Sequence, residues 1–545
     1  MGGAFLSVLL FSLVSPVVAA SNFDPQAHIQ QGIYIGRQTT INDTNVNSWY
    51  GIPYAQQPIG NLRWKPPQPL TTSGSTNEAD TPTACPQRGS HGFLMTESCL
   101  TLNIHAPENA SNLPVYVWIH GGSFTGGAGA EYNAIPFVTT SIIHSVPVVV
   151  VTINYRLGLL GFMADQGLFD EKSGVNNRST TGNYGILDQI MALNWVKKNI
   201  AGFGGNPDQI TIGGESAGGI SVTILLTSPL VTNGTFQRAI VESGGIWPNA
   251  ADPLSNAINN SGNILRATVN CTTVECLRSL TVDQILAVQR IISSKSIFGT
   301  AAAPVIDGYV LTDIMENNYA RGNFLKVPVL IGTNTNETSL FTCPVFNGTA
   351  NSTQVQAFFN LLYNATIVNA IPTIYGPISA YDNPMNYLNT VFSNSWEHCG
   401  SRRIASKFSS YGLPSYLYTY DHLLPVAPHC FGVAHAAELP MLFPYLLPYL
   451  YPNYNFTVQE QQLSMNMMLY WANFIYKSDP NYSGSPANWD AYLSSSDNDF
   501  VFNINSRMRN SYYNFVCSRL WDLYAVTNST PASLAVGCSK GHHYF

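Results

Sequence analysis

A short glycine-flanked segment contains the residue best suited to nucleophilic chemistry. Ser216 lies in Gly-Glu-Ser-Ala-Gly, residues 214–218, directly after a β-type run at 209–212. Glycines two residues on either side of a serine leave room for a tight strand-to-helix turn, which strains the serine backbone and exposes Oγ. The following helix would offer its N-terminal amides to an anion. The pattern predicts a nucleophilic serine; the alternative is a glycine-rich strand end with a solvated serine.

Backbone N–H groups that could stabilise an oxyanion occur at two places. A serine nucleophile needs preorganised donors for the charge that develops on the substrate oxygen. Gly121 and Gly122 follow an apolar run at 115–119, so the end of a strand there would expose their amides. Together with the amide of Ala217, they could direct three N–H groups at one oxygen. The alternative is an ordinary glycine turn after a strand.

A serine hydroxyl also needs a base, and the base needs an acid that fixes its tautomer. His435 lies in a loop of small residues after the predicted strand at 416–420, and we predict that it is the base. Glu337 is the only carboxylate in the loop after the apolar run at 327–331, and it is the predicted acid. The order Ser216, Glu337, His435 along the chain is that of α/β-hydrolases.

Strand-like and helix-like segments alternate around these residues. The apolar runs at 115–119 and 148–153 are typical of strands buried on both faces of a mostly parallel sheet. Apolar residues at helical spacing predict a helix over 186–200, between the second run and the serine turn, and another over 461–477. Further strands are predicted at 238–241, 327–331 and 416–420. This alternation predicts an open α/β sheet with helices on both faces.

Composition and the N-terminal residues point to a secreted protein. Charged residues make up 10% of the chain, and the net charge of −7 comes without a basic patch, which argues against a nucleic-acid partner. An apolar stretch at 5–18 that ends in small residues predicts a signal peptide over residues 1–20. No later stretch is long and apolar enough to span a membrane. No linker or repeat interrupts the remainder, so residues 21–545 are predicted to form one domain.

Cysteines and glycosylation sequons agree with an extracellular location. The nine cysteines fit an oxidising compartment, and an odd number leaves at least one unpaired within the chain. Sequons of the type Asn-x-Ser/Thr are numerous enough to suit a glycoprotein whose sugars keep a weakly charged surface soluble. They lie at Asn42, Asn109, Asn177, Asn233, Asn259, Asn270, Asn336, Asn347, Asn351, Asn364, Asn455, Asn481 and Asn528.

Ordered motifs between about residues 33 and 505 show which family this sequence resembles. They are Tyr-Gly-Ile-Pro-Tyr-Ala at 50–55, Glu-Ser-Cys-Leu-Thr-Leu-Asn at 97–103, Asn-Tyr-Arg-Leu-Gly at 154–158, Gly-Ile-Leu-Asp-Gln at 185–189, Phe-Gly-Gly-Asn-Pro at 203–207 and Tyr-Trp-Ala-Asn-Phe at 470–474. With the serine pentapeptide, they make the chain similar to the type-B carboxylesterase/lipase family, which includes cholinesterases. In character it resembles the secreted fungal esterases and lipases of that family.

The resemblance implies an α/β-hydrolase fold, with a large, mostly parallel central sheet, helices on both faces and a small N-terminal antiparallel sheet. It implies hydrolysis of an ester through an acyl-enzyme, without a metal or cofactor. The site residues that it implies are the triad Ser216, Glu337 and His435, the oxyanion amides of Gly121, Gly122 and Ala217, and the flanking residues Glu215 and Ser243. The family has Asp-Glu-Gly around the acid where this chain has Asn-Glu-Thr, a departure that removes no catalytic group.

Disulfide pairing is also implied by the resemblance. The expected pairs are Cys85–Cys99, Cys271–Cys276 and Cys399–Cys517. Cys343 and Cys430 lie near the acid and base loops and are candidates for a fourth pair, which would leave Cys538 free.

Several functions within this fold remain to be separated. The loop between Cys85 and Cys99 has only 13 residues, with Phe93-Leu94-Met95 as its apolar tip, whereas lipases of the family have a much longer flap. An esterase with an open pocket is therefore favoured over a lid-gated lipase or sterol esterase, and a feruloyl-type aryl esterase is a further alternative. The loop lacks the tryptophan with which cholinesterases bind choline. A non-catalytic adhesion protein of the same fold is disfavoured because the triad is intact.

Overall fold

The computed structural model describes residues 24–71, 74–89, 92–246, 251–296 and 302–527. The predicted signal peptide, Asn528 and Cys538 lie outside the described residues.

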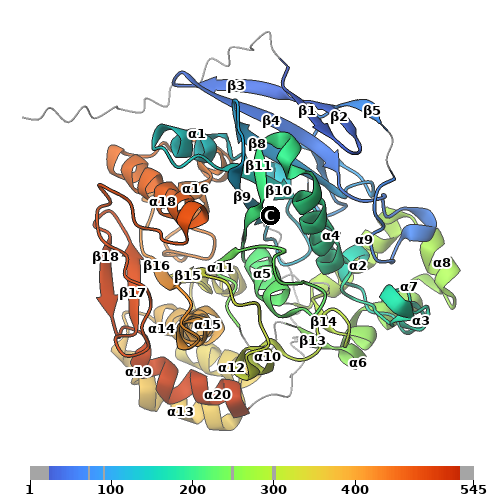
Figure 1. The fold of residues 1–545 in the computed structure, drawn as a ribbon. Helices are drawn as coiled ribbons and strands as arrows, with labels where there is room; N and C mark the ends of the chain where they lie inside the picture. Colours follow the sequence, from blue (N-terminus) through green and yellow to red (C-terminus); the bar gives the residue numbers. More distant parts are fainter. Residues whose placement is uncertain (1–23, 72–73, 90–91, 247–250, 297–301, 528–545) are drawn as a thin grey trace, which may run out of the picture.

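A large mixed sheet is the centre of the molecule (Figure 1). Its strands follow the order β18-β17-β16-β15-β12-β11-β9-β10-β8-β4-β3. The seven strands from β17 to β10 are parallel to their neighbours, and antiparallel strands extend the sheet on both sides. The strands are β3 (Arg37–Ile41), β4 (Thr44–Pro53), β8 (Thr101–Pro107), β9 (Leu113–Ile119), β10 (Val149–Ile153), β11 (Gly205–Glu215), β12 (Arg238–Glu242), β15 (Val329–Asn334), β16 (Ser415–Tyr420), β17 (Asn498–Phe502) and β18 (Arg507–Asn510).

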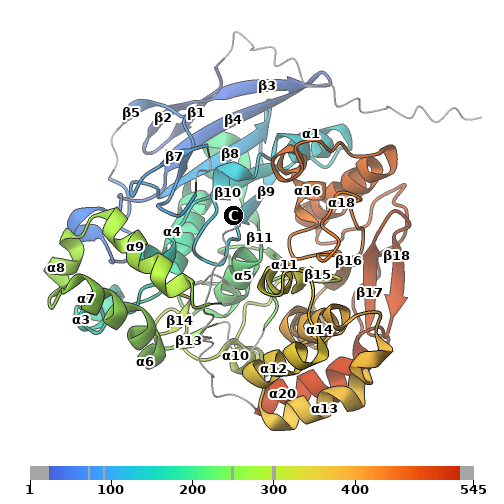
Figure 2. The same ribbon diagram turned by 180° about the vertical axis from the view of Figure 1, so that it is seen from behind.

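Helices cover both faces of this sheet because its central strands carry apolar side chains on both sides. In β9, Val115 and Val117 belong to one core, whereas Tyr116 and Trp118 belong to the other. The first core is covered by α4 (Tyr184–Asn199), α5 (Ala217–Thr227) and α15 (Cys399–Ser410). The second is covered by α1 (Ile135–Ile143), α16 (Leu439–Leu442) and α18 (Val458–Lys477), which Figure 2 shows from the other side. This arrangement is an α/β-hydrolase fold, as the sequence predicts.

The expected small N-terminal sheet is present. β1 (Gln26–Ile29) pairs antiparallel with β2 (Gly32–Ile35), and β5 (Ser75–Glu78) then joins β2 in the parallel sense. Two further pairs of very short strands are β6 (Thr83–Ala84) with β7 (Leu94–Met95), and β13 (Asp252–Pro253) with β14 (Val305–Ile306).

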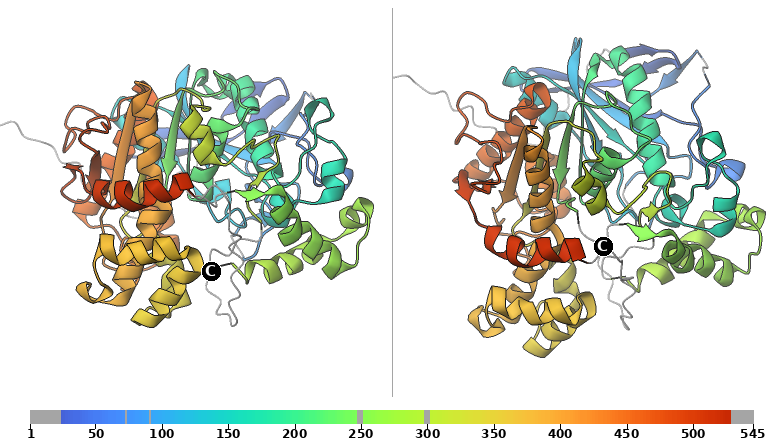
Figure 3. Two further views of the ribbon diagram at one scale, coloured as in Figure 1. Left: turned by 90° about the horizontal axis from the view of Figure 1, so that it is seen from below. Right: turned by 60° about the horizontal axis from the view of Figure 1, so that its bottom comes forward.

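Two groups of helices lie on opposite sides of the molecule, one coloured mostly light green and the other yellow to red (Figure 3). One contains α6 (Leu254–Ala257), α7 (Asn263–Val269), α8 (Val274–Ser279) and α9 (Val282–Ser293), with α2 (Gly158–Phe162) and α3 (Gln166–Asp170) beside it. The other contains α12 (Ser352–Leu362), α13 (Ala365–Tyr375), α14 (Pro384–Ser393), α19 (Asn514–Val516) and α20 (Asp522–Thr527). The remaining helices are α10 (Met315–Arg321), α11 (Ser339–Val345) and α17 (Leu447–Leu450). No described helix combines the length and apolar character needed to cross a bilayer.

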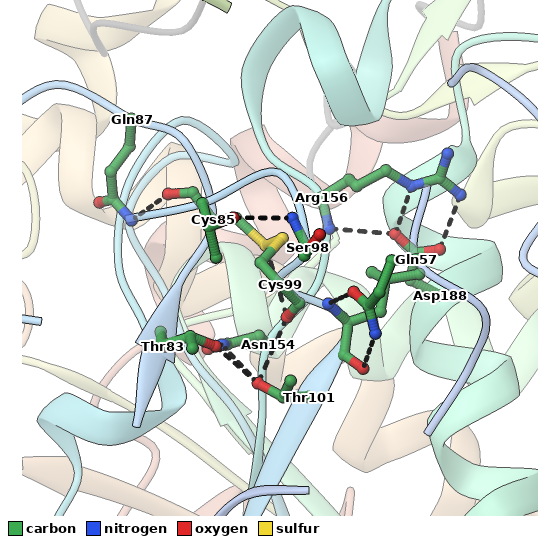
Figure 4. The surroundings of a disulfide bond; sticks show 12 residues. Gln57, Thr83, Cys85, Gln87, Ser98, Cys99, Thr101, Asn154, Arg156 and Asp188 are labelled. Atoms are coloured by element: carbon green, nitrogen blue, oxygen red, sulfur yellow. Dashed lines mark hydrogen bonds and ion pairs between the residues drawn. A yellow bond between two sulfur atoms is a disulfide. The ribbon is translucent and has the colours of Figure 1, made fainter. Parts of the chain in front are cut away.

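Four disulfides cross-link the described chain. The three expected pairs, Cys85–Cys99, Cys271–Cys276 and Cys399–Cys517, are confirmed. The candidate fourth pair, Cys343–Cys430, is also formed. Figure 4 shows the surroundings of Cys85–Cys99, where Gln87 Nε2 donates a hydrogen bond to Cys85 O at 3.1 Å.

Candidate active site

The candidate residues converge because five neighbouring parallel strands end at one edge of the sheet. In spatial order these strands are β9, β11, β12, β15 and β16. The residues that follow them are Gly121 after β9, Ser216 after β11, Ser243 after β12, Glu337 after β15 and His435 in the loop after β16. Ligands of open parallel sheets bind at the carboxyl ends of the strands. The sheet therefore brings together residues that are more than 300 positions apart in the sequence.

Ser216 occupies the strained turn that the sequence predicts. Its φ of 57° and ψ of −124° lie outside the regions that suit a residue with a Cβ atom. The amide of Ser216 donates to Glu242 O at 2.9 Å, which fixes the turn to the neighbouring strand. Gly218 cannot carry a side chain, because its Cβ would lie 1.9 Å from Ile119 O. This turn leaves Ser216 partly exposed, although Glu215 and Ala217 are buried.

The glycine turn after β9 lies directly against the serine. A Cβ atom on Gly121 would be 3.0 Å from Ser216 Cβ and 2.7 Å from Glu215 Oε2, so a side chain there would displace both residues. Gly122 has a φ of 104°, which favours glycine. Among the described residues, no backbone carbonyl accepts a hydrogen bond from the amides of Gly121, Gly122 or Ala217, although the amide of Gly121 faces the hydroxyl of Tyr132. An acceptor from outside the chain can therefore meet these amides without breaking a backbone hydrogen bond.

Ser123 is an additional feature of this turn that sequence reasoning did not include. Its φ is 54°, and its amide likewise has no acceptor among the described residues. Only its position next to the two glycines could have pointed to it.

His435 and Glu337 are in direct hydrogen-bond contact. Nδ1 of His435 lies 2.6 Å from Glu337 Oε2, and both side chains are buried. The other carboxylate oxygen of Glu337 accepts hydrogen bonds from Ser243 Oγ and from the amide of Asn334, each at 2.6 Å. Burial alone would raise the pKa of Glu337, but His435 and these two donors hold it below its usual value. A buried, ionised carboxylate thus fixes the ring of His435.

The second ring nitrogen of His435 has no hydrogen-bond partner among the described residues, Ser216 Oγ included. Nε2 lies 3.3 Å from Glu215 Oε1, without the geometry of a hydrogen bond. Burial lowers the pKa of His435, but the carboxylates of Glu215 and Glu337 outweigh it and raise the pKa. The structure therefore joins His435 to Glu337 and brings Glu215, the residue before Ser216, close to His435 Nε2. It does not form a hydrogen bond between Ser216 and His435. Such bonds are often long in enzymes without substrate.

Two aromatic side chains pack against the ring of His435, and both belong to helical segments. The centroids of Phe341 and Trp396 lie 5.4 and 5.3 Å from that of the imidazole. Phe341 belongs to α11, which begins two residues after Glu337, and Trp396 belongs to a turn of π-helix between α14 and α15. These contacts restrict rotation of the ring.

Further buried carboxyl groups surround the pair, and sequence reasoning missed most of them. Glu438 Oε2 accepts from Asn334 Nδ2 at 2.5 Å, Glu397 Oε2 accepts from the amide of Gly245 at 2.8 Å, and Glu242 Oε1 accepts from Trp471 Nε1 at 2.8 Å. Burial raises the pKa of Glu438 to about 7, and that of Glu215 to about 8. Burial also raises the pKa of Glu397 and Glu242 well above the usual value. Single glutamates far apart in the sequence carry no motif that could have revealed this cluster.

Comparisons with known proteins agree with this geometry. The family model described as the carboxylesterase family matches residues 24–519. Cocaine esterase of Homo sapiens is 32% identical over 527 residues, which cover 89% of both chains. Acetylcholinesterase of Electrophorus electricus is 30% identical and covers 88% of this chain and 84% of its own. Fumonisin B1 esterase of Sphingopyxis macrogoltabida is 36% identical over 60% of this chain and 59% of its own. The chain belongs to the carboxylesterase family and is a carboxylic-ester hydrolase.

Proposed function

We propose that this enzyme hydrolyses esters through an acyl-enzyme on Ser216, with His435 as base and Glu337 as acid. The 2.6 Å contact between His435 Nδ1 and the buried Glu337 carboxylate carries this proposal. It keeps a proton on Nδ1 and leaves Nε2 as the basic nitrogen. The strained turn at Ser216 supports the role of nucleophile, since it presents Oγ beyond the end of the sheet.

The reaction follows from these positions. Ser216 Oγ attacks the ester carbonyl while His435 Nε2 accepts its proton, and the imidazolium is stabilised by Glu337. The amides of Gly121, Gly122 and Ala217 donate to the oxyanion of the tetrahedral intermediate. His435 then returns the proton to the leaving alcohol. Water enters, His435 removes its proton, and the same steps release the acid and regenerate Ser216.

A small or moderately sized ester is the substrate that the loop over the site favours. Met95 and Leu94, at the tip of the Cys85–Cys99 loop, pair with β6, and Gln87 Nε2 donates to Gly127 O at 2.9 Å. The amide of Gly127 donates back to Gln87 Oε1 at 2.7 Å, so the base of the loop is tied to the glycine turn. A loop this short, with these contacts at its described residues, is poorly suited to act as a mobile lid.

Hydrolysis of lipid or sterol esters is the second candidate, and one observation favours it. Leu94 is 61% exposed and Met95 is 40% exposed, so the loop presents an apolar tip to solvent. An apolar tip of this kind could contact a lipid surface. Two of the relatives, however, are named as esterases of cocaine and of fumonisin B1, and these names support the esterase proposal. Feruloyl-type aryl esters remain within the proposed substrate range.

Secretion as a glycoprotein is part of the same proposal. Four disulfides suit an oxidising compartment. Most sequon asparagines are exposed, namely Asn42, Asn109, Asn177, Asn233, Asn259, Asn270, Asn347, Asn351, Asn364 and Asn455. Asn336 and Asn481 are half-buried, and their side chains are engaged. Asn336 Oδ1 accepts from Val433 N at 3.0 Å, and Asn481 Nδ2 donates to Trp489 O at 3.0 Å.

A substrate screen with a serine-directed probe tests the proposed function. Purified enzyme should hydrolyse nitrophenyl esters, with the highest kcat/KM among short to middle chain lengths, and a fluorophosphonate should label Ser216 and stop turnover. Feruloyl, sterol and long-chain esters in the same screen test the alternatives. Absence of both labelling and hydrolysis would instead support a non-catalytic binding protein.

A further inference from the structure

The acid and base loops are joined side by side through a series of contacts. Asn336 N donates to Val433 O at 2.8 Å, and Val433 N donates to Asn336 Oδ1 at 3.0 Å. His435 N donates to Glu337 O at 3.3 Å, next to the side-chain contact between the same residues. The backbones of the two loops therefore determine how the base meets the acid.

The Cys343–Cys430 disulfide joins the same two loops covalently, close to these hydrogen bonds. Cys343 lies in α11, six residues after Glu337, and Cys430 lies five residues before His435. The disulfide thus joins the two loops at one place, and the contact between Glu337 and His435 joins them at a second place nearby. In the sequence, the two cysteines are 87 positions apart. The disulfide therefore converts two distant loops into one local unit that contains both the acid and the base.

The base loop has little regular structure of its own to hold it. Residues 421–434 form no helix, and their strand pairing is limited to a single bridge between Ala434 and Asn336. Leu423 is 51% exposed and Val426 is 41% exposed. Segments with an exposed surface and few ladder hydrogen bonds open locally at low free energy. The base loop is such a segment, so its covalent attachment next to His435 has a large effect on where the ring lies.

We propose that the Cys343–Cys430 disulfide is a positioning bridge for the catalytic base, and that its reduction converts the esterase into a slow but folded form. The inference rests on the proposed function, since it takes His435 as base and Glu337 as acid. Cys343 is buried but Cys430 is only half-buried, so a dithiol can reach the bridge. The dithiol would lose two hydrogen atoms and become a cyclic disulfide, while the two cysteines become thiols.

Two of the other bridges are shielded from a dithiol, and the third is a matched control. Both cysteines of Cys85–Cys99 and of Cys399–Cys517 are buried. The remaining bridge, between Cys271 and Cys276, has one buried and one half-buried cysteine, like the proposed positioning bridge. It lies at α8, in the helical group that contributes none of the candidate site residues.

The first test compares two double variants, Cys343→Ala/Cys430→Ala and the control Cys271→Ala/Cys276→Ala. In the first, we expect kcat to fall about 10- to 100-fold, because small displacements of a catalytic group cost rates of this size. We expect KM to stay within about twofold, since the bridge does not touch the ester. The acidic limb of the pH profile should move to lower pH, because a loosened Glu337 stabilises the imidazolium less. The control variant should keep the kcat of the wild type.

Labelling with the fluorophosphonate separates positioning from loss of fold. If the bridge positions the base, every molecule of the variant still becomes labelled, but with a smaller rate constant. A lower labelled fraction with an unchanged rate constant would mean that the bridge only stabilises the fold, and would overturn the proposal. An unchanged kcat in folded, fully labelled variant would also overturn it.

Reduction of the wild-type enzyme provides the same test if the variant does not fold. Mild treatment with dithiothreitol, followed by alkylation and peptide mapping, should show loss of activity in step with thiols at Cys343 and Cys430, and recovery on reoxidation. Full activity with both thiols alkylated would overturn the proposal. Wild-type enzyme that neither labels nor hydrolyses any ester would refute the proposed function itself, and the two failures are therefore distinct.

Discussion

Replacement of Glu215 by glutamine should move the acidic limb of the pH–rate profile to lower pH. His435 must be neutral to accept the proton of Ser216, so activity rises as pH increases through the pKa of the imidazole. A carboxylate beside Nε2 stabilises the protonated, inactive ring and raises that pKa. The limb of the wild-type enzyme should therefore lie above ~6.5, the reference pKa of histidine. Glu215→Gln removes the charge but keeps the shape of the side chain.

The size of this effect follows from the distance between the two groups. Unit charges 3.3 Å apart, the separation of His435 Nε2 from Glu215 Oε1, attract by about 1.3 kcal/mol at a dielectric constant of ~80 and by about 5 kcal/mol at ~20. One pKa unit corresponds to about 1.4 kcal/mol. The pKa shifts that correspond to these two energies are both larger than the error of a pH profile. Opposite charges at such distances commonly shift a pKa by ~1–3 units. We expect the limb to move down by at least about one pH unit.

The assay is kcat/KM for one nitrophenyl ester from pH 5 to 9, since this parameter reports groups of the free enzyme. The position of the limb is the readout, because glutamine could also alter the plateau through its hydrogen bonds. Glu78→Gln is the control: Glu78 is an exposed residue of β5, and its loss should leave the profile unchanged. A Glu215→Gln profile that superimposes on that of the wild type would show that Glu215 carries no charge next to the protonated base.

Three further predictions concern the triad, the glycans and the substrate interface. Ser216→Ala should abolish turnover and leave the melting temperature near that of the wild type, whereas Glu337→Gln and His435→Ala should each cost about 10³-fold or more in kcat; near-normal kinetics would remove a residue from the mechanism. Glycopeptide mass spectrometry of active enzyme should find Asn336 and Asn481 unmodified, because their half-buried side chains are held against Val433 N and Trp489 O and leave little room for a branched sugar; high occupancy would mean that these loops are open. The rate should follow simple saturation as an ester passes its solubility limit, and a sharp increase there would reveal a lid.

The sequence predicted those parts of the structure that depend on local pattern. The apolar run at 115–119 became β9, since strands buried on both faces must be apolar throughout. The Gly-x-Ser-x-Gly pattern predicted the turn at Ser216. Its two glycines are needed because a Cβ atom at either position would clash with neighbouring backbone atoms. Glu337 and His435 were predicted as acid and base because each follows a recognisable strand, and the structure joins them at 2.6 Å. Chain order and strand ends are thus enough to predict that these two residues meet at one edge of the sheet.

Contacts between distant segments could not be predicted in the same way. Glu397 accepts a hydrogen bond from the amide of Gly245, although the two residues are 152 positions apart in the sequence. Nothing near Glu397 indicates a buried acid, because most of its neighbours at 393–398 are polar residues that would suit an exposed surface equally well. The same holds for Ser123, whose positive φ follows from the path of the glycine turn and not from its residue type. Such features depend on how the strand ends and helices meet in three dimensions.

Hydrogen bonding, and not burial, distinguishes Glu337, the proposed acid, from the other carboxyl groups around it. All the carboxyls of the cluster are buried, which raises the pKa of each. Glu337 alone among them has a lowered pKa, because His435 binds one of its oxygens and two further donors bind the other. Each of the others has one buried oxygen without a described hydrogen-bond partner, namely Glu215 Oε1, Glu242 Oε2, Glu397 Oε1 and Glu438 Oε1. Glu242, Glu397 and Glu438 are therefore stabilised by keeping their protons. Glu215 differs from these three because its Oε1 lies 3.3 Å from His435 Nε2, so that a protonated imidazole favours its ionised form. The donors that bind Glu337 thus keep it ionised whether or not the imidazole is protonated, next to Nδ1 of His435.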